Sequence, residues 1–280
     1  ILDEREAELR AGDASHLEDE LSAIALEVEP ILRKEWRRLR MAANETVRPV
    51  YASPASTHAA RLFTNRVITP HIKPAPIWWR SYAKPLGYPG DFQIMNYIYG
   101  EPPRGATLFG TVFHQLGLEE RLASGIPGRM AVIRGRIEEL VAECESRSHD
   151  VVRIASLAAG PAREVEEFLK GYTGGARIHW TLIDQDDRAL SFANERVLRA
   201  AARHDGRMEV TCLYASFRQL ISDPTVLARV EPQDMIYSAG FFDYLNKESA
   251  QNVIRNAYEL LCPGGRLFFG NAMPAPDALW

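Results

Sequence analysis

The sequence has few cysteines, and no two of them lie close together. Cys144, Cys212 and Cys262 form no CxxC pair, which argues against a disulfide scaffold or a structural zinc site and fits a reducing cytoplasm. No apolar run approaches the roughly 20 residues that span a bilayer. No signal peptide is visible either, although the chain begins at Ile1 rather than at a methionine. We therefore expect a cytoplasmic protein without membrane insertion.

A surplus of positive charge is also lacking. The formal net charge is −4, which gives no reason to expect a nucleic-acid partner. The sequence contains no metal-ligand spacing, no serine nucleophile elbow, no P-loop and no complete GxGxxG motif. The sequence is therefore that of a globular protein, with no signal for a nucleic-acid partner or a resident metal.

Short apolar runs alternate with helical patterns from about residue 150 onwards. The first run, Val151 to Leu157, is rich in β-branched residues and is followed by three small residues and a helix that ends near Gly171. Four more strands are expected, at 179–183, 208–213, 234–237 and 266–269. This alternation predicts an α/β fold with a Rossmann-like, doubly wound and mainly parallel sheet, whose ligands bind outside the carboxyl ends of the strands.

The first half of the chain has helical periodicity and almost no strand signal. Helices are expected from Leu17 onwards, with Pro30 kinking or dividing the first of them, and then at 57–67, 106–123 and 127–146. The basic segment RKEWRRLR (33–40) is interpreted as a solvated helix face with a packed tryptophan rather than a membrane or partner surface. Residues 1–148 are thus predicted to form a helical cap domain, and residues 149–280 the α/β domain.

Residues 70–100 concentrate prolines, aromatic residues and glycines. We expect a long ordered loop that forms a lid or a wall of the acceptor pocket, or that joins the cap to the α/β domain by aromatic packing. Asp91 is expected to cap a short helix that contains Ile94. The candidate acceptor contacts in this segment are Trp79, Tyr82, Asn96 and Tyr97.

Several polar residues follow the predicted strands. Asp184 ends the second strand, where such folds hold ribose hydroxyls. Asp186 or Asp187 is expected to cap the next helix, and Asn246 a later one. Arg80, Lys84 and Arg134 are candidates for holding an anionic acceptor, although long basic side chains usually lie on the surface.

Four motifs in order resemble those of class I S-adenosylmethionine-dependent methyltransferases: AAGPA (158–162), LIDQD (182–186), YSAGFFDYL (237–245) and LLCPGGRLFFGN (260–271). Ala158 and Ala162 stand where that superfamily usually has glycine, and we expect them to be tolerated with negative φ and tighter cofactor packing. The resemblance implies S-adenosylmethionine as cofactor and S-adenosylhomocysteine as product. The cofactor-binding residues that it implies are Ala158, Ala159, Gly160, Pro161, Asp184, Gln185, Ser216, Phe217, Ser238, Ala239 and Gly240.

A narrower resemblance includes KPLGYPGDFQIMNYIYG (84–100) and points to the bacterial group of 3-hydroxypalmitic acid methyl ester synthases. It implies methyl transfer to a small molecule, such as the carboxylate of a hydroxy fatty acid. Such a carboxylate is ionised and needs no base, whereas an amine or hydroxyl acceptor would draw on Tyr88, Asp91, Asp243 or Tyr244. Phe241 is a further candidate wall for the acceptor. The superfamily usually has seven strands, so the domain is expected to lack its last strands.

Other functions remain open from the sequence. The acceptor could instead be a natural product or an amino-acid-like compound, methylated at nitrogen, oxygen or sulfur. A nicotinamide-dependent reductase is disfavoured by the missing glycines. A regulatory protein that binds an adenosyl ligand without turnover is the alternative outside enzymes. The sequence indicates no oligomeric state.

Overall fold

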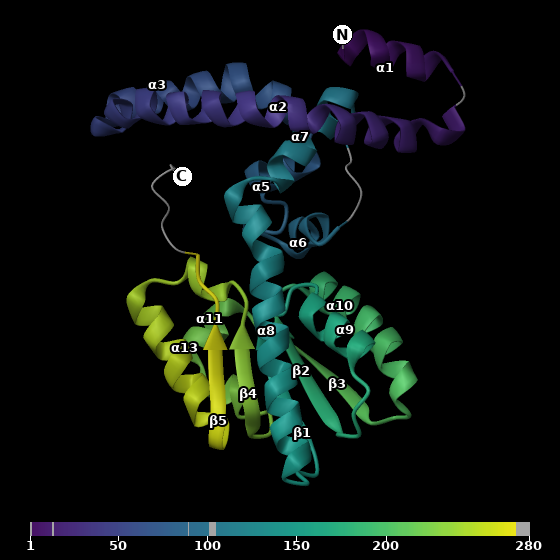
Figure 1. Cartoon of the computed structure of the whole chain (residues 1–280). Helices are drawn as coiled ribbons and strands as arrows, with labels where there is room; N and C mark the ends of the chain where they lie inside the picture. Colours follow the sequence, from purple (N-terminus) through teal and green to yellow (C-terminus); the bar gives the residue numbers. More distant parts are fainter. Residues whose placement is uncertain (1, 13, 89, 101–104, 273–280) are drawn as a thin grey trace. The chain divides into compact units, whose positions relative to one another are not determined.

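The computed structural model describes residues 2–12, 14–88, 90–100 and 105–272 (Figure 1). The chain divides into two compact units, one ending at Ser124 and the other formed by Gly125–Ala272. The division falls inside helix α8 (Arg121–Ser146), earlier than the boundary expected near residue 149. The reason is that most of α8 packs on the sheet, where its Ile137 side chain is fully buried.

The second unit contains a five-stranded sheet, and every strand pair in the described residues is parallel (Figure 1). The strand order is β3-β2-β1-β4-β5. The strands are β1 (Val152–Leu157), β2 (Ile178–Asp184), β3 (Met208–Tyr214), β4 (Gln233–Ser238) and β5 (Leu261–Phe269). The predicted Rossmann-like α/β fold is confirmed.

Helices cover both faces of this sheet. One core lies under α8, α9 (Arg163–Gly171) and α10 (Asp187–Ala201), and the other lies under α11 (Phe217–Ser222), α12 (Pro224–Leu227) and α13 (Lys247–Glu259). Successive side chains of a strand point to opposite faces, so Ile154 of β1 enters the first core and Ala155 enters the second. A strand buried on both faces must be apolar throughout, which explains the continuous run in the sequence.

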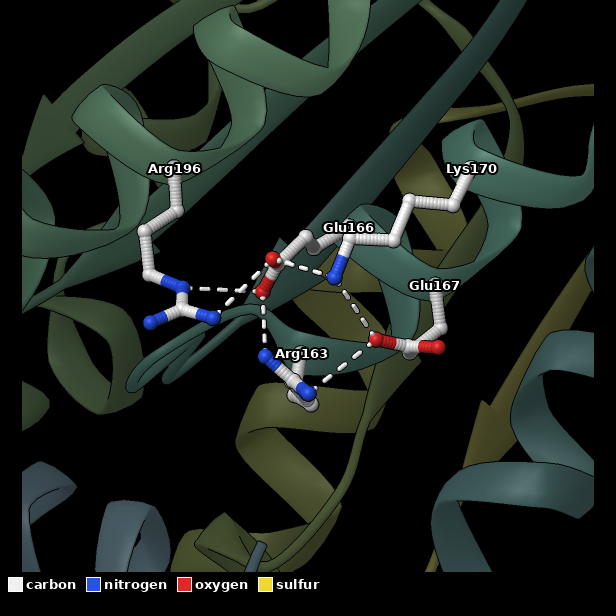
Figure 2. Close-up of polar contacts among 5 residues, drawn as sticks. All are labelled: Arg163, Glu166, Glu167, Lys170 and Arg196. Atoms are coloured by element: carbon white, nitrogen blue, oxygen red, sulfur yellow. Dashed lines mark hydrogen bonds and ion pairs between the residues drawn. The ribbon is translucent and has the colours of Figure 1, made fainter. Parts of the chain in front are cut away.

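An ion-pair network joins α9 to α10 (Figure 2). The Glu166 carboxylate accepts hydrogen bonds from Arg196 at 2.8 and 3.0 Å and from Arg163 at 2.8 Å, and it pairs with Lys170 at 2.7 Å. Burial raises the pKa of Glu166, but the hydrogen bonds from Arg196 and Lys170 outweigh burial and lower that pKa to about 2. The network therefore stabilises the ionised carboxylate between the two helices.

Strand β5 begins earlier than predicted, at Leu261 rather than Arg266. Gln233 of β4 pairs with Leu261, and Met235 pairs with Arg266. The Pro-Gly-Gly sequence (263–265) is thus an irregularity within the strand rather than a turn before it, and its first glycine has a φ of +82°. Glycine suits this position because other residues rarely adopt such a φ.

The first unit is helical in its described residues. Its helices are α1 (Leu2–Ala11), α2 (Leu17–Val47), α3 (Pro54–Phe63), α4 (Thr69–Ile72), α5 (Pro76–Ala83), α6 (Phe92–Ile98) and α7 (Leu108–Leu118), with short 3₁₀ turns at Ala14–His16 and Arg48–Ala52 and a π turn at Thr64–Ile68. Helix α2 runs from Leu17 to Val47 without a break at Pro30, so the proline does not divide it, and the alternative of a kink stays a prediction. Pro30 and Leu26 are exposed, and water can satisfy the carbonyl that the proline leaves unpaired.

The segment 70–100 contains short helices where we expected a long loop. Its prolines start helices as well as ending them: Pro76 is the first residue of α5, where a fixed φ and a missing N–H cost nothing.

Earlier in the first unit, Trp36 of α2 packs edge-on against Trp78 and Phe113, with ring centroids 6.1 and 4.9 Å apart. This contact confirms that the tryptophan of the basic segment is a packing residue.

Candidate functional site

The strand order reverses between β1 and β4. From β1 the chain proceeds outwards to β2 and β3 on one side, and then to β4 and β5 on the other. Ligands of open α/β sheets bind outside the carboxyl ends of the strands at such a reversal. The turns that follow β1 and β4, residues 158–162 and 238–240, therefore form the candidate site.

Every second residue of the turn after β1 has a positive φ. Ala158, Gly160 and Ala162 have φ angles of +55°, +53° and +46°. Our expectation that the two alanines keep negative φ is wrong, because the chain reverses so tightly that every second residue must be left-handed. Left-handed conformations cost a non-glycine residue about 1–2 kcal/mol. A Cβ atom built on Gly160 would meet no atom within 4 Å, so this part of the backbone is open to a ligand.

Asp184 holds this turn in place. Its Oδ2 atom accepts a hydrogen bond from the Gly160 N–H at 2.8 Å, and its Oδ1 atom accepts one from the Asp186 N–H at 3.0 Å. The side chain is buried, which raises the pKa of the carboxyl, while the hydrogen bond from Gly160 opposes the rise. The structure thus gives Asp184 the task of joining the loops after β1 and β2; its contact with a ribose stays a prediction.

The loop after β2 offers a second acceptor. Asp186 caps α10, as predicted, because its Oδ1 atom accepts a hydrogen bond from the Arg188 N–H at 3.0 Å. Its Oδ2 atom is buried without a partner in the described residues. Next to it, the side-chain oxygen of Gln185 lies 3.5 Å from the backbone nitrogen of Phe217. This arrangement brings the loops after β2 and β3 together.

The hydroxyl of Ser216 is already engaged. It accepts the Gln219 N–H at 3.2 Å, and the Gln219 side chain accepts the Ser216 N–H at 2.9 Å, which completes a capping box at the start of α11. The Phe217 ring packs against the Phe241 ring at a tilt of 44°, with ring centroids 4.4 Å apart. Phe241 is only 1% exposed and packs in the core, and its contact with an acceptor stays a prediction.

The turn after β4 combines an unpaired hydroxyl with small residues. Ser238 is buried, and its Oγ atom has no partner among the described residues. Ala239 and Gly240 follow. Asp243 accepts a hydrogen bond from the Ala272 N–H at 2.6 Å, whereas Tyr244 is exposed. The proposed base at Asp243 is therefore attached to the backbone after β5, and both catalytic assignments stay predictions.

The sequence reasoning missed Arg129. This residue of α8 lies over the ends of β4 and β5, because a Cβ atom on Gly240 would be 3.1 Å from its Nη1 atom and one on Gly270 would be 2.8 Å from its Cδ atom. Its Nη1 atom is 3.8 Å from an Asp243 oxygen. The spacing offered a signal, since Arg129 is in phase with the buried Ile133 and Ile137 at intervals of four residues.

Glu164 was missed as well. It lies in the first turn of α9, and its Oε1 atom accepts a hydrogen bond from the Tyr237 hydroxyl at 2.7 Å. Complete burial raises the pKa of this carboxyl, while the bond from Tyr237 and the charge of Arg129 act in the opposite direction. A buried acid beside an arginine at the sheet edge is a functional candidate.

The predicted acceptor residues 79–97 belong to the first unit. Asp91 caps α6, as predicted, by accepting the N–H groups of Gln93 and Ile94, and it also accepts two 2.7 Å contacts from Arg80. Its carboxylate is thus committed to structure, and its role as a base stays a prediction. Arg80 is likewise paired within the unit.

The other acceptor candidates differ in exposure. Trp79 and Tyr82 are exposed, and their ring centroids are 6.3 Å apart. Asn96 is buried, and its Nδ2 atom lacks a partner in the described residues. The Tyr97 ring packs on His114, and Tyr88 is half-buried. These positions do not by themselves define a pocket.

The two remaining basic candidates have ordinary surroundings. Lys84 is exposed and ends α5 with a left-handed φ of +49°. Arg134 pairs with Glu138 one turn along α8, at 3.2 Å. Within the ranges described by the structure, no three His, Cys, Asp or Glu side chains are grouped as metal ligands, and no helix has the length and apolar character to cross a bilayer.

No protein-family model matches the chain, and no curated protein matches it. Solved structures that match include the glycopeptide N-methyltransferase MtfA complexed with sinefungin, at 17% identity over 47% of each chain with a TM-score of 0.33. A SAM-dependent methyltransferase from Geobacter sulfurreducens in complex with S-adenosyl-L-homocysteine matches at 15% identity, 51% of this chain, 47% of that chain and a TM-score of 0.33.

A possible exported protein from Bordetella parapertussis matches at 18% identity, 63% of this chain, 52% of that chain and a TM-score of 0.40. The chain thus spans about half the length of the structures that it matches.

Proposed function

We propose that this protein is an S-adenosylmethionine-dependent methyltransferase that acts on a small molecule. The observation that carries the proposal is the turn after β1, where Gly160 is held by Asp184 and left open on its ligand side. The turn lies where the strand order reverses, which is the binding position of α/β sheets. Three of the four ordered motifs, at 158–162, 182–186 and 237–245, reach that same edge, whereas the Pro-Gly-Gly part of the fourth lies towards the opposite end of β5.

The charge at this turn favours a cationic ligand over a dinucleotide. A pyrophosphate needs free N–H groups and positive potential at the helix N-terminus. Here Pro161 removes one N–H, and the buried Glu164 places a carboxyl in the first turn of α9. A sulfonium and an ammonium group tolerate a nearby acid, whereas a diphosphate is repelled by it. A nicotinamide-dependent reductase is therefore the weaker candidate.

Each residue of the edge has a proposed task. Gly160 allows close approach of the methionine part, Asp184 and the unpartnered oxygen of Asp186 are assigned to the ribose, and Phe217 flanks the adenine. When bound, S-adenosylmethionine supplies a sulfonium methyl group, which an acceptor takes by in-line attack as the carbon–sulfur bond breaks and its electrons return to sulfur. Holding the partners in near-attack geometry can lower the barrier by about 7–11 kcal/mol at best.

The acceptor class is proposed from the narrower motif resemblance alone. A hydroxy fatty acid would present an ionised carboxylate, so the protein would need no general base. An amine or hydroxyl acceptor would need one, and Asp243 and Tyr244 are the candidates in the sheet unit. The carboxylate is the simpler case, because Asp243 is already bound to the Ala272 N–H.

Calorimetry with S-adenosylhomocysteine, S-adenosylmethionine and NADH tests the cofactor. We expect binding of both adenosyl ligands and none of NADH; the reverse would refute the proposal. Mass spectrometry after incubation with methyl-labelled S-adenosylmethionine and a panel of hydroxy acids, amino acids and amines then tests turnover. Binding without a labelled product from any member would favour a regulatory binding protein.

A further inference from the structure

Arg129 carries more hydrogen-bonding capacity than its surroundings use. A guanidinium has five N–H donors, yet none of them makes a hydrogen bond within the described residues. Its Nε atom is buried without a partner, and its contact with Asp243, at 3.8 Å, is too long for a hydrogen bond. Leaving the buried Nε donor unpaired is costly, and the side chain as a whole is 24% exposed, so its Nη atoms are open to an acceptor that binds there.

Glycines make room for this arginine. A side chain at Gly240 or at Gly270 would press on the Arg129 side chain, with contacts of 3.1 and 2.8 Å from a Cβ atom. The guanidinium therefore lies directly against the backbone at the end of β4. The unpaired hydroxyl of Ser238 belongs to the same strand end. The carboxyl end of β4 thus carries a neutral donor, the Ser238 hydroxyl, and lies under a cation, Arg129.

Glu164 supplies the opposite charge nearby. Glu164 is 4% exposed, and its Oε1 atom accepts a hydrogen bond from the Tyr237 hydroxyl at 2.7 Å. The charge of Arg129 opposes the rise that burial causes in the pKa of this carboxyl, and among the described residues the ion-pair contact of Arg129 is with Asp243 rather than with Glu164. An arginine over the end of β4 and a glutamate held by Tyr237 of the same strand form a complementary frame for a ligand carrying both charges.

Resting on the proposed function, we infer that Arg129 and Glu164 bind the amino-acid part of S-adenosylmethionine. The Arg129 guanidinium takes the α-carboxylate, and the Glu164 carboxylate takes the α-ammonium group. A zwitterion satisfies both side chains at once, because a planar guanidinium matches a carboxylate and an ammonium group donates to the remaining oxygen of Glu164. Tyr237 holds Glu164 in position through its hydroxyl.

Three ligands separate the two charges. S-Adenosylhomocysteine carries both, its decarboxylated analogue keeps only the amine, and 5′-methylthioadenosine has neither. In calorimetry with the full chain, we expect Arg129→Gln to lower the affinity for S-adenosylhomocysteine by about 10- to 100-fold, because the substitution removes a charge-assisted hydrogen bond. The affinities for the other two ligands should stay unchanged. Glu164→Gln keeps an acceptor for the Tyr237 hydroxyl. It should lower the affinities for S-adenosylhomocysteine and its decarboxylated analogue and leave the affinity for 5′-methylthioadenosine unchanged.

Controls distinguish this inference from a structural role. Arg136→Gln removes an exposed arginine of the same helix that pairs with Glu139, and it should alter none of the three affinities. Circular dichroism melts identify variants that fail to fold, in which case Arg129→Lys replaces Arg129→Gln with the same expected ligand order. An equal loss for all three ligands, or no loss for any, overturns the inference. Failure of the unaltered protein to bind any of them refutes the proposed function itself.

Discussion

The backbone N–H of Gly160 donates a 2.8 Å hydrogen bond to the Oδ2 atom of Asp184. The bond links the turn after β1 to the end of β2, so the shape of the candidate site depends on a side chain from the neighbouring strand. Asp184 is only 2% exposed. A buried carboxylate with two backbone donors is preorganised, since it needs no rearrangement before a ligand arrives.

Replacing Asp184 with asparagine should loosen the site and the fold together. An amide has a single oxygen, so one of the two backbone donors would face an NH₂ group, and we expect a loss of about 1–3 kcal/mol in the free energy of unfolding. Urea denaturation measures this loss, and calorimetry should show weaker S-adenosylhomocysteine binding. Asp187→Asn, at the exposed neighbouring acid, is the matched control. Unchanged stability in Asp184→Asn would show that the two bonds are dispensable.

Ala158→Gly should stabilise the protein. The φ of +55° strains alanine and suits glycine, and relief of that strain exceeds the entropy that glycine adds to the unfolded chain. We expect a gain of about 0.5–1 kcal/mol in the free energy of unfolding, read from the denaturant midpoint. Ala159→Gly, at a neighbouring residue without a positive φ, should instead lose about 0.5–1 kcal/mol. Loss of stability in both variants would contradict the conformational account.

Glu166→Gln should remove a stabilisation that depends on pH. The pKa of Glu166 is lowered from 4.5 to about 2 in the folded protein, so the carboxylate stabilises the fold above pH 4.5, and this contribution is lost as the pH falls towards 2. Its partners are partly exposed, which reduces the expected effect to about 1–2 kcal/mol at neutral pH.

The measurement is the free energy of unfolding of both proteins between pH 7 and the lowest pH at which they fold. Their difference should be constant at neutral pH and shrink below about pH 4.5, the unshifted value. Glu195→Gln, which breaks an exposed pair with Arg199, should change stability little at any pH. A difference that grows on acidification would refute the network's role.

Two substitutions of Asp91 distinguish a structural role of this carboxylate from a role as a general base. Asp91→Asn keeps an oxygen for the cap of α6 but loses the charge that pairs with Arg80, whereas Asp91→Ala loses both. We expect Asp91→Ala to lower the free energy of unfolding by about 3–5 kcal/mol and Asp91→Asn by less. Thermal denaturation ranks them. Two stable variants without methyl transfer would instead support the catalytic assignment.

The positions of the strands, and some of the polar residues at the ends of strands and helices, were predictable from the sequence. Buried parallel strands are apolar on both faces, so the run from Val151 to Leu157 stands out, and Asp184 and Asn246 mark a strand end and a helix cap by residue type alone. Asn246 caps α13 as expected, with its side chain accepting the Ser249 N–H at 2.8 Å. Local chemistry determined these features, and local patterns therefore revealed them.

Features set by tertiary packing were not readable. The left-handed φ of Ala158 follows from the tight path between strands, and no residue pattern near it favours that angle. Arg129 comes from a helix that we assigned to the cap, because periodicity shows a helix but not the surface on which it packs. Pro30 stays inside α2 because its surroundings are open to water, which the sequence does not state.

The irregularity at residues 263–265 sets the phase of everything after it in β5. Removing one residue there would turn Leu267 and Phe268 to the opposite faces of the sheet, because side chains alternate along a strand. It would also displace Gly270 from beneath Arg129. A length variant of this short segment would therefore damage ligand capture at a distance, without altering any group that touches the ligand.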